Sequence, residues 1–220
     1  MAGRFITFEG GEGVGKSTQV RRLAVRLRET GAEVVTTREP GGSPRAEVLR
    51  SVLLSGAAKP FGPTAETMLI ASARADHVDR VIRPALARGA WVLCDRFIDS
   101  TRAYQGTLGE VDAGVIAALE RVATEGARPG LTVVLDAPAA TGINRARARA
   151  GEGALADRFE AEDASFHERL REAFVAIARA EPGRCVLVDA SGSEEDVAQR
   201  VWTAFAARYG EALAPSGAEA

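Results

Sequence analysis

Short apolar runs alternate with longer helical patterns along most of the chain, and this alternation limits the fold more than any other feature. The runs are apolar throughout, which is typical of parallel strands covered on both faces. We therefore expect an α/β fold, a five-stranded parallel sheet with helices on both faces. Strands are predicted over residues 4–10, 32–37, 90–95, 131–137 and 184–190. Helices are predicted over residues 17–30, 46–56, 63–88, 112–124, 139–150, 165–180 and 194–208, with a kink or break at Pro84.

Composition narrows the class of protein further. The 220 residues, 46% of them hydrophobic, are enough for one sizeable core. A net charge of −2 gives no basic excess that would indicate nucleic-acid binding. Cys94 and Cys185 lie in apolar strands, where we expect buried free thiols. We see no signal peptide and no apolar run long enough to span a bilayer, so we expect a cytoplasmic protein that does not bind membranes.

A glycine-rich segment, GGEGVGKS over Gly10–Ser17, separates the first expected strand from the first expected helix. It fits the pattern G-x-x-x-x-G-K-[ST] in the strand–loop–helix context that this pattern requires. Its backbone N–H groups and the start of the helix would surround phosphates, Lys16 would reach the β- and γ-phosphates, and Ser17 would bind Mg²⁺. GTPases, ATPases and kinases all share this pattern. The residues expected to bind the nucleotide are Gly10, Gly11, Glu12, Gly13, Val14, Gly15, Lys16, Ser17 and Thr18.

Two charged positions indicate a second ligand. Glu12 is a carboxylate inside a phosphate-binding loop, and it is either a solvated charge or a group that faces another ligand with a hydroxyl or amine. Asp95 ends the apolar strand WVLCD, where an aspartate supports Mg²⁺ or caps a helix. Arg96 follows Asp95 directly, and a guanidinium in the same crevice would bind a second phosphate.

Further arginines recur near expected strand ends and on helices. Arg38, Arg50 and Arg74 are each either solvated charges or ligand contacts, and Arg74 has apolar neighbours on one side. Residues 143–160 contain an arginine-rich helix and a glycine-bearing loop, which form either a solvated basic helix end or a lid. A lid would bring Arg149 to the charge on the transferring phosphoryl group.

Taken together, EGGEGVGKST, TREPGG, DRF followed by STRAYQG, and DRFE after an arginine-rich helix resemble the bacterial thymidylate kinase family. The resemblance runs in order from Arg4 to about Tyr209, and TREPGG and DRFIDSTRAYQG are its most discriminating parts. It implies a P-loop nucleoside monophosphate kinase architecture with a lid, conversion of dTMP to dTDP with ATP and Mg²⁺, and a homodimer through long helices. It also implies one kinase domain over residues 1–210, a lid at about residues 148–160, and a flexible tail over residues 211–220.

The resemblance assigns roles to the charged residues. Glu12 stands where the family's P-loop carboxylate meets the deoxyribose 3′-hydroxyl. Arg50 and Arg96 stand where arginines bind the phosphate of dTMP, and Arg38 is a further candidate. Arg74 stands where an arginine faces the thymine.

The remaining implied roles concern the pocket and the chemistry. Thr101, Tyr104 and Gln105 fall in the stretch that lines the base and sugar pocket, and Arg149 stands at the lid arginine. Ile70 replaces the family's usual phenylalanine, so the base loses aromatic stacking worth on the order of 1 kcal/mol. The implied catalytic residues are Lys16, Arg96 and Arg149, and the implied metal ligands are Ser17 and Asp95.

Two other functions stay open at this point. One is another nucleoside monophosphate or deoxynucleoside kinase on the same scaffold, since a thymine methyl group contributes only about 1 kcal/mol of discrimination. The other is a nucleotide-dependent binding switch, which would leave the arginines without a ligand. His77 and His167 are interpreted as solvated or structural, and Trp91 and Trp202 as core anchors.

Overall fold

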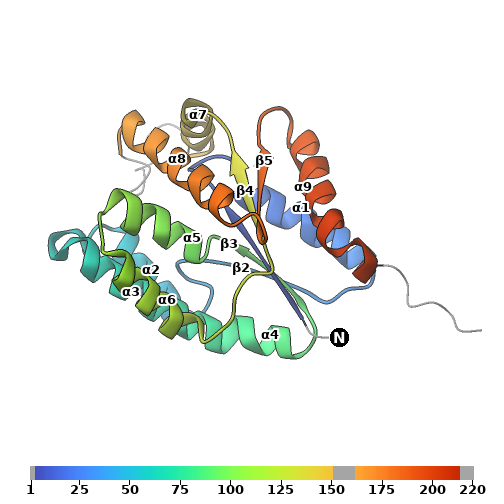
Figure 1. The fold of residues 1–220 in the computed structure, drawn as a ribbon, viewed down its shortest axis with the longest axis horizontal. Coiled ribbons are helices and arrows are strands. Elements are labelled where there is room, and N and C mark those ends of the chain that lie inside the picture. Colours follow the sequence, from blue (N-terminus) through green and yellow to red (C-terminus); the bar gives the residue numbers. More distant parts are fainter. Residues whose placement is uncertain (1–2, 151–161, 214–220) are drawn as a thin grey trace, which may run out of the picture.

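A five-stranded parallel sheet forms the centre of the computed structural model, which describes residues 3–150 and 162–213 (Figure 1). The strand order is β2-β3-β1-β4-β5, and every adjacent pair is parallel. The carboxyl ends of the strands therefore meet at one edge, where open α/β sheets bind their ligands. The expected fold class is confirmed. The strands are β1 (Arg4–Glu9), β2 (Val34–Arg38), β3 (Trp91–Asp95), β4 (Leu131–Asp136) and β5 (Cys185–Asp189).

Helices connect successive strands and cover both faces of the sheet (Figure 1). Short helix-like turns occur at Lys59–Phe61 and Gly210–Leu213 (3₁₀) and at Val78–Ile82 and Arg102–Leu108 (π). The α-helices are α1 (Lys16–Glu29), α2 (Pro44–Leu54), α3 (Gly62–His77), α4 (Arg83–Ala87), α5 (Ile98–Thr101), α6 (Ala113–Thr124), α7 (Ala139–Ala150), α8 (Ala164–Ala180) and α9 (Glu194–Tyr209).

Two helical regions differ from the sequence prediction. The expected long helix over residues 63–88 is helical almost throughout, but a π-helical turn separates α3 from α4. Pro84 follows this π-helical turn within a continuous helical stretch, where its missing N–H removes one helical hydrogen bond. The helical stretch formed by α5 and the π-helical turn after it was not predicted, because it is too short for a clear helical period and contains Gly106.

One face of the sheet packs on α1 and α9 through an apolar core. Alternate residues of β1, Ile6 and Phe8, point to this face, and both are fully buried. They pack in one cluster with residues of the two helices such as Leu27 and Phe205. Helical spacing of the apolar residues therefore places both helices against the same surface.

The opposite face of the sheet carries buried polar groups at its centre. Thr7 and Glu9, the β1 residues that alternate with Ile6 and Phe8, are fully buried there. The hydroxyls of Thr7 and Thr132 lie 2.8 Å apart, which joins β1 to β4. Strand residues were expected to be apolar throughout, so these positions correct that expectation.

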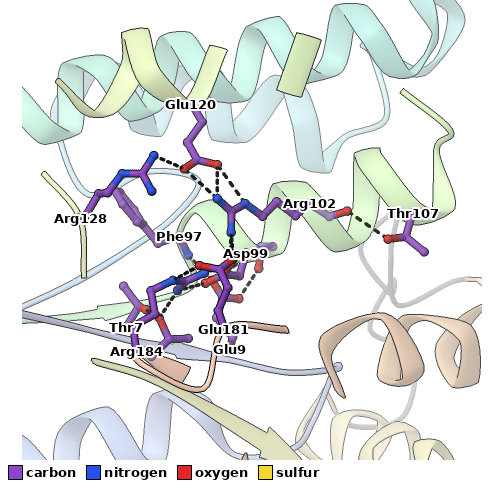
Figure 2. A network of polar contacts seen from close by, with 12 residues as sticks. Thr7, Glu9, Phe97, Asp99, Arg102, Thr107, Glu120, Arg128, Glu181 and Arg184 are labelled. Carbon is purple, nitrogen blue, oxygen red and sulfur yellow. Dashed lines mark hydrogen bonds and ion pairs between the residues drawn. The ribbon is translucent and has the colours of Figure 1, made fainter. Parts of the chain in front are cut away.

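Apolar clusters that include Phe5 and Val134 also pack on this face, and an ion-pair network beside its polar centre ties α5 to the sheet (Figure 2). Both carboxylate oxygens of Asp99 accept hydrogen bonds from Arg184, at 2.7 Å each. Arg102 forms a two-bond contact with Glu120 on α6, at 2.9 Å and 2.9 Å. We call the side chains of Asp99, Arg102, Glu120, Glu181 and Arg184 the α5 ion network.

The remaining structural interpretations are settled by burial. Cys94 and Cys185 are free and buried, as expected. His77 and His167 are buried, so neither is solvated. Trp91 lies in the core, and Trp202 stacks on Phe205 with ring centroids 5.4 Å apart. None of the described helices has the length and apolar character needed to cross a membrane.

Candidate active site

The P-loop connects the end of β1 to the start of α1, and two of its glycines are required by geometry. Gly10 has φ +128°, and a Cβ added there would lie 2.3 Å from the carbonyl oxygen of Leu135. Gly15 precedes α1 in the left-handed region, with φ +99°. A side chain at either position would be strained, so glycine is needed for the loop to turn here.

Lys16 lies at the start of α1 and folds back over the P-loop. Its Nζ donates to the carbonyl oxygens of Gly10, at 3.1 Å, and Gly11, at 2.6 Å. Burial, and then the neighbouring Arg96, lower the pKa of Lys16 to about 8, although three nearby carboxylates act in the opposite direction. Phosphate oxygens at this position would stabilise the ammonium form and replace the two carbonyl contacts.

Ser17 and Asp95 come together at the carboxyl edge of the sheet, as the sequence predicts. The hydroxyl of Ser17 donates a short hydrogen bond to Oδ2 of Asp95. The described residues contain no cluster of three or more His, Cys, Asp or Glu side chains arranged to hold a metal. Mg²⁺ in kinases needs only one or two protein oxygens besides water and substrate phosphates, so this pair fits that ion.

Glu12 and Arg96 form the charged centre of the site. One Glu12 oxygen, Oε1, accepts from Arg96 Nη2 at 2.7 Å and from the Tyr104 hydroxyl at 2.6 Å. Arg96 also donates to the Gly10 carbonyl and to Ser100. The Glu12 side chain is 19% exposed and the Arg96 side chain 13%, so the interpretation of Glu12 as a solvated loop charge is wrong.

These contacts decide the charge of Glu12. Burial alone would raise its pKa, but Arg96, Lys16 and the hydrogen bond from Tyr104 outweigh that effect and hold it at about 2. Glu12 is therefore ionised, and its negative charge and the positive charge of Arg96 stabilise each other. The pKa of Arg96 is raised in turn, because Glu12 and other anions outweigh its desolvation.

Glu9 is a buried carboxyl group beneath Arg96, and sequence reasoning missed it. Its oxygens accept from the Phe97 N–H at 2.7 Å and from the Ser100 hydroxyl at 2.7 Å. Burial and then the charge of Asp99 raise its pKa to about 7. These contacts support Arg96, which adopts the left-handed conformation at φ +68°.

A cavity of about 380 Å³ opens beside the P-loop. It reaches from Lys16 to residues contributed by α2, α3 and the helical stretch after β3. Its volume and its mixture of apolar and charged walls are typical of a small-molecule site. All the predicted substrate residues line it, namely Glu12, Arg38, Arg50, Ile70, Arg74, Arg96, Thr101, Tyr104 and Gln105.

The P-loop residues divide between the two sides of the loop. Gly15, Lys16, Ser17 and Thr18 face the large cavity with Glu12. Gly10, Gly11 and Val14 line a much smaller space behind the loop, against β4 and α8, and Glu12 borders both spaces. Gly13 lines neither space and has φ +66°.

The arginines of the cavity are held by contacts that the sequence did not reveal. Arg50 donates to the carbonyl oxygen of Pro40 at 2.7 Å. Arg38 pairs with Glu47 at 3.0 Å and is more than half exposed. Arg74 is buried against Glu39 at 2.7 Å. The Glu39–Pro40 peptide bond is cis.

Part of the predicted lid lies outside the described residues. Residues 151–160, with Arg158, are in that part, and the side chain of Arg149 is also outside the description, although its backbone belongs to α7. Arg145, one turn earlier, donates to the carbonyl oxygens of Ala190 and Gly192.

The P-loop, the strand-end aspartate and the adjoining cavity together define a P-loop kinase of the nucleoside monophosphate class. Comparison with known proteins makes the family specific. The thymidylate kinase family model matches residues 8–201. The chain is 58% identical to a thymidylate kinase of Bradyrhizobium diazoefficiens over 92% of this chain and 89% of that protein.

Two further relatives agree. A thymidylate kinase of Nitrobacter winogradskyi is 58% identical over 92% of this chain and 88% of its own length. The crystal structure of thymidylate kinase from Ehrlichia chaffeensis superimposes with a TM-score of 0.75 at 30% identity, covering 93% of this chain and 100% of that one. The chain belongs to the thymidylate kinase family.

Proposed function

We propose that this chain performs the reaction of its family, the ATP-dependent phosphorylation of dTMP to dTDP, with ATP on the P-loop and dTMP in the adjoining cavity. The observation that supports this arrangement is the continuity of the cavity from Lys16 to the buried polar groups of Arg74 and Gln105. A protein that only binds a nucleotide as a switch has no need for this second compartment.

The reaction brings two anions together, so neutralising their charge is the main task. Lys16 and the P-loop amides bind the β- and γ-phosphates of ATP, and Arg50 and Arg96 bind the phosphate of dTMP, with Arg38 at the cavity mouth. Arg149 reaches the transferring group when the lid closes. The acceptor oxygen is already an anion, so the transfer needs no general base.

Magnesium is the second proposed cofactor. Ser17 and Asp95 would hold it through their side-chain oxygens. Bound there, Mg²⁺ would neutralise charge on the ATP phosphates. Lys16 and Arg96 then add the positive charges that this chain itself contributes.

The cavity wall selects the acceptor. Arg74, Thr101 and Gln105 are buried polar groups that would meet the edge of the base, and Ile70 packs on its face. Glu12 receives the deoxyribose 3′-hydroxyl while Tyr104 and Arg96 hold its carboxylate. Buried donors discriminate between bases where a mismatched base leaves them without an acceptor, and Nη1 of Arg74 is such a donor.

We further propose a cytoplasmic homodimer with one kinase domain per chain over residues 1–210. Of the tail expected over residues 211–220, residues 211–213 belong to a 3₁₀ turn and residues 214–220 lie outside the described part of the chain. Three neighbouring helices each expose a large apolar side chain: Val48 on α2, Met68 on α3 and Val122 on α6, which are 63%, 52% and 68% exposed. Burying them between two copies would lower the free energy of the dimer. Light scattering after size exclusion would measure the mass, and a monomer at micromolar concentration would contradict the homodimer.

The decisive assay is ADP release with ATP and Mg²⁺ in the presence of dTMP, dUMP, dCMP, dGMP or AMP in turn. Turnover led by dTMP supports the proposed acceptor. Turnover led by another monophosphate would keep the kinase chemistry and assign a different base pocket. If no monophosphate is phosphorylated and the protein only hydrolyses ATP slowly, the result would favour a nucleotide-dependent switch.

A further inference from the structure

A buried chain of side chains connects Arg74, in the wall of the cavity, to the interior. Arg74 Nε donates to Glu39 Oε2 at 2.7 Å. The other oxygen of Glu39 lies 2.9 Å from His77 Nδ1, and His77 Nε2 lies 2.7 Å from the Thr37 hydroxyl. Arg74 and Glu39 are each 3% exposed and His77 is fully buried. None of these three groups can exchange its protein partners for bulk water.

The guanidinium of Arg74 is therefore fixed on one side and open on the other. Besides its bond to Glu39, Arg74 donates from Nη2 to the Phe97 carbonyl and to the Thr101 hydroxyl, both at 3.0 Å. Nη1 has no hydrogen-bond partner among the described residues. Arg74 lines the cavity and also a much smaller space toward α6. A guanidinium has five N–H donors in a rigid plane, so fixing Nε and Nη2 also fixes the direction of Nη1.

The direction of Arg74 depends on Glu39, and Glu39 is oriented by His77. A carboxylate only accepts hydrogen bonds, so Nδ1 of His77 carries the proton of their contact. With one oxygen on Arg74 and the other on His77, the carboxylate plane of Glu39 has a single orientation. His77 lies one helical turn after Arg74 on α3, so both side chains that bond to Glu39 come from the same helix.

His77 also supports the loop that holds a second arginine. Gly42 packs directly on the ring: a Cβ added there would lie 2.4 Å from His77 Nε2 and 2.6 Å from Thr37 Oγ1. The same loop contains Pro40, whose carbonyl oxygen accepts from Arg50 at 2.7 Å. The ring therefore contacts the loop from which both Arg74 and Arg50 receive a fixed partner.

We propose that Glu39 and His77 are positioning residues for the acceptor nucleotide: His77 orients Glu39, and Glu39 fixes Arg74 with Nη1 directed at the base. This inference rests on the proposed function, because it takes dTMP as the occupant of the cavity. Among the described residues, the side-chain hydrogen bonds of Glu39 and His77 go to Arg74, to each other and to Thr37, and not to the P-loop. Both should therefore affect the binding of dTMP and leave the binding of ATP unchanged.

The test compares steady-state kinetics of His77→Leu and His77→Asn in two backgrounds, wild type and Arg74→Ala. His77→Leu removes both ring contacts, whereas Asn carries an N–H₂ at the same distance from the backbone as Nδ1 and keeps the bond to Glu39. We expect His77→Leu to raise KM for dTMP about tenfold, the loss that one charge-assisted hydrogen bond produces, with kcat and KM for ATP within about twofold. His77→Asn should recover most of this loss. Ser72→Ala, on the exposed side of the same helix, is the matched control and should leave all constants unchanged.

The Arg74→Ala background separates positioning from general support. If His77 acts through Arg74, the tenfold effect of His77→Leu should shrink to less than about twofold once Arg74 is absent. The same increase in both backgrounds, or equal changes in kcat and KM for ATP, would overturn the inference. If His77→Leu does not fold, Glu39→Gln, which keeps the shape and removes the charge, takes its place in both backgrounds, and the same results support or overturn the inference.

Failure of this inference and failure of the proposed function give different results. If wild type shows no turnover with dTMP, or if Arg74→Ala leaves KM for dTMP unchanged, the proposed acceptor site is wrong and the inference falls with it. Suppose that wild type turns over dTMP and Arg74→Ala raises KM for dTMP. If His77→Leu then raises this KM by the same factor with and without Arg74, only the inference is overturned.

Discussion

The α5 ion network makes a sharp prediction about stability, centred on Asp99. This side chain is fully buried and receives two hydrogen bonds of 2.7 Å from Arg184 and one of 3.2 Å from Arg102. Asp99→Asn keeps the shape but removes the charge, and it turns an N–H₂ donor toward a guanidinium that can only donate. Breaking a buried ion pair from one side costs about 3–5 kcal/mol, because the remaining charge stays buried without its partner.

The measurement is urea unfolding followed by tryptophan fluorescence at pH 7. Asp99→Asn should lower the free energy of unfolding by about 3–5 kcal/mol with an unchanged m value. For a chain of this size that corresponds to a melting temperature lower by roughly 6–20 °C. The matched control is Glu33→Gln. This substitution breaks the ion pair between Glu33 and Arg88, whose side chains are 53% and 54% exposed. It should lower the free energy of unfolding by less than about 1 kcal/mol.

The two variants must differ for the reasoning to hold. If Asp99→Asn loses no more stability than Glu33→Gln, the buried network contributes no more than a surface pair. A reduced m value together with a lower midpoint would instead show that unfolding is no longer two-state, and the free energies would then have to be compared by calorimetry.

Three further predictions concern the site. The folded-state pKa of Glu9, about 7, lies above its ordinary value of 4.5, so its protonated form stabilises the fold fully below pH 4.5 and this stabilisation is lost as pH rises to 7. Glu9→Gln should therefore remove a decline of roughly 3 kcal/mol between those two pH values, and equal slopes in the two proteins would contradict the buried-acid interpretation. Tyr104→Phe, which removes a hydrogen bond to Glu12 and leaves its ion pair with Arg96, should lower kcat/KM for dTMP by roughly tenfold, and an effect confined to ATP would count against it. Arg149→Ala should lower kcat by about 100-fold while KM for both substrates changes less than about threefold, and unchanged kcat would exclude a catalytic role.

Local patterns were sufficient to predict the strands, most helices and the P-loop. The P-loop could be predicted because its pattern consists of consecutive residues. The strands could be predicted because strands covered on both faces are apolar over most of their length. Ser17 and Asp95 could be paired because parallel strands bring their carboxyl ends to one edge. The resemblance to a known family then identified the cavity residues, which the structure brings together around one cavity.

Long-range polar contacts could not be predicted from the sequence. Asp99 and Arg184 are 85 positions apart, and nothing near either residue identifies the other as its partner. Glu9 reads as the end of an apolar strand, and Glu39 as a turn residue before a proline, although both are buried carboxyl groups. The short helix α5 has fewer residues than two helical turns, so no periodicity could reveal it.

The two faces of the sheet should differ in which substitutions they tolerate. On the side of α1 and α9, the core cluster that includes Ile6 and Leu27 is held by apolar, non-directional packing, so volume-conserving exchanges there should cost little. On the side of α5, Thr7, Glu9 and Thr132 take part in hydrogen bonds whose geometry depends on each partner. A saturation library selected for dTMP kinase activity should therefore accept other apolar residues of similar volume at Ile6, and fewer replacements at Thr7, its neighbour in the same strand. The segment that carries Tyr104 and Gln105 is thus attached to the sheet through the residues that tolerate the fewest substitutions.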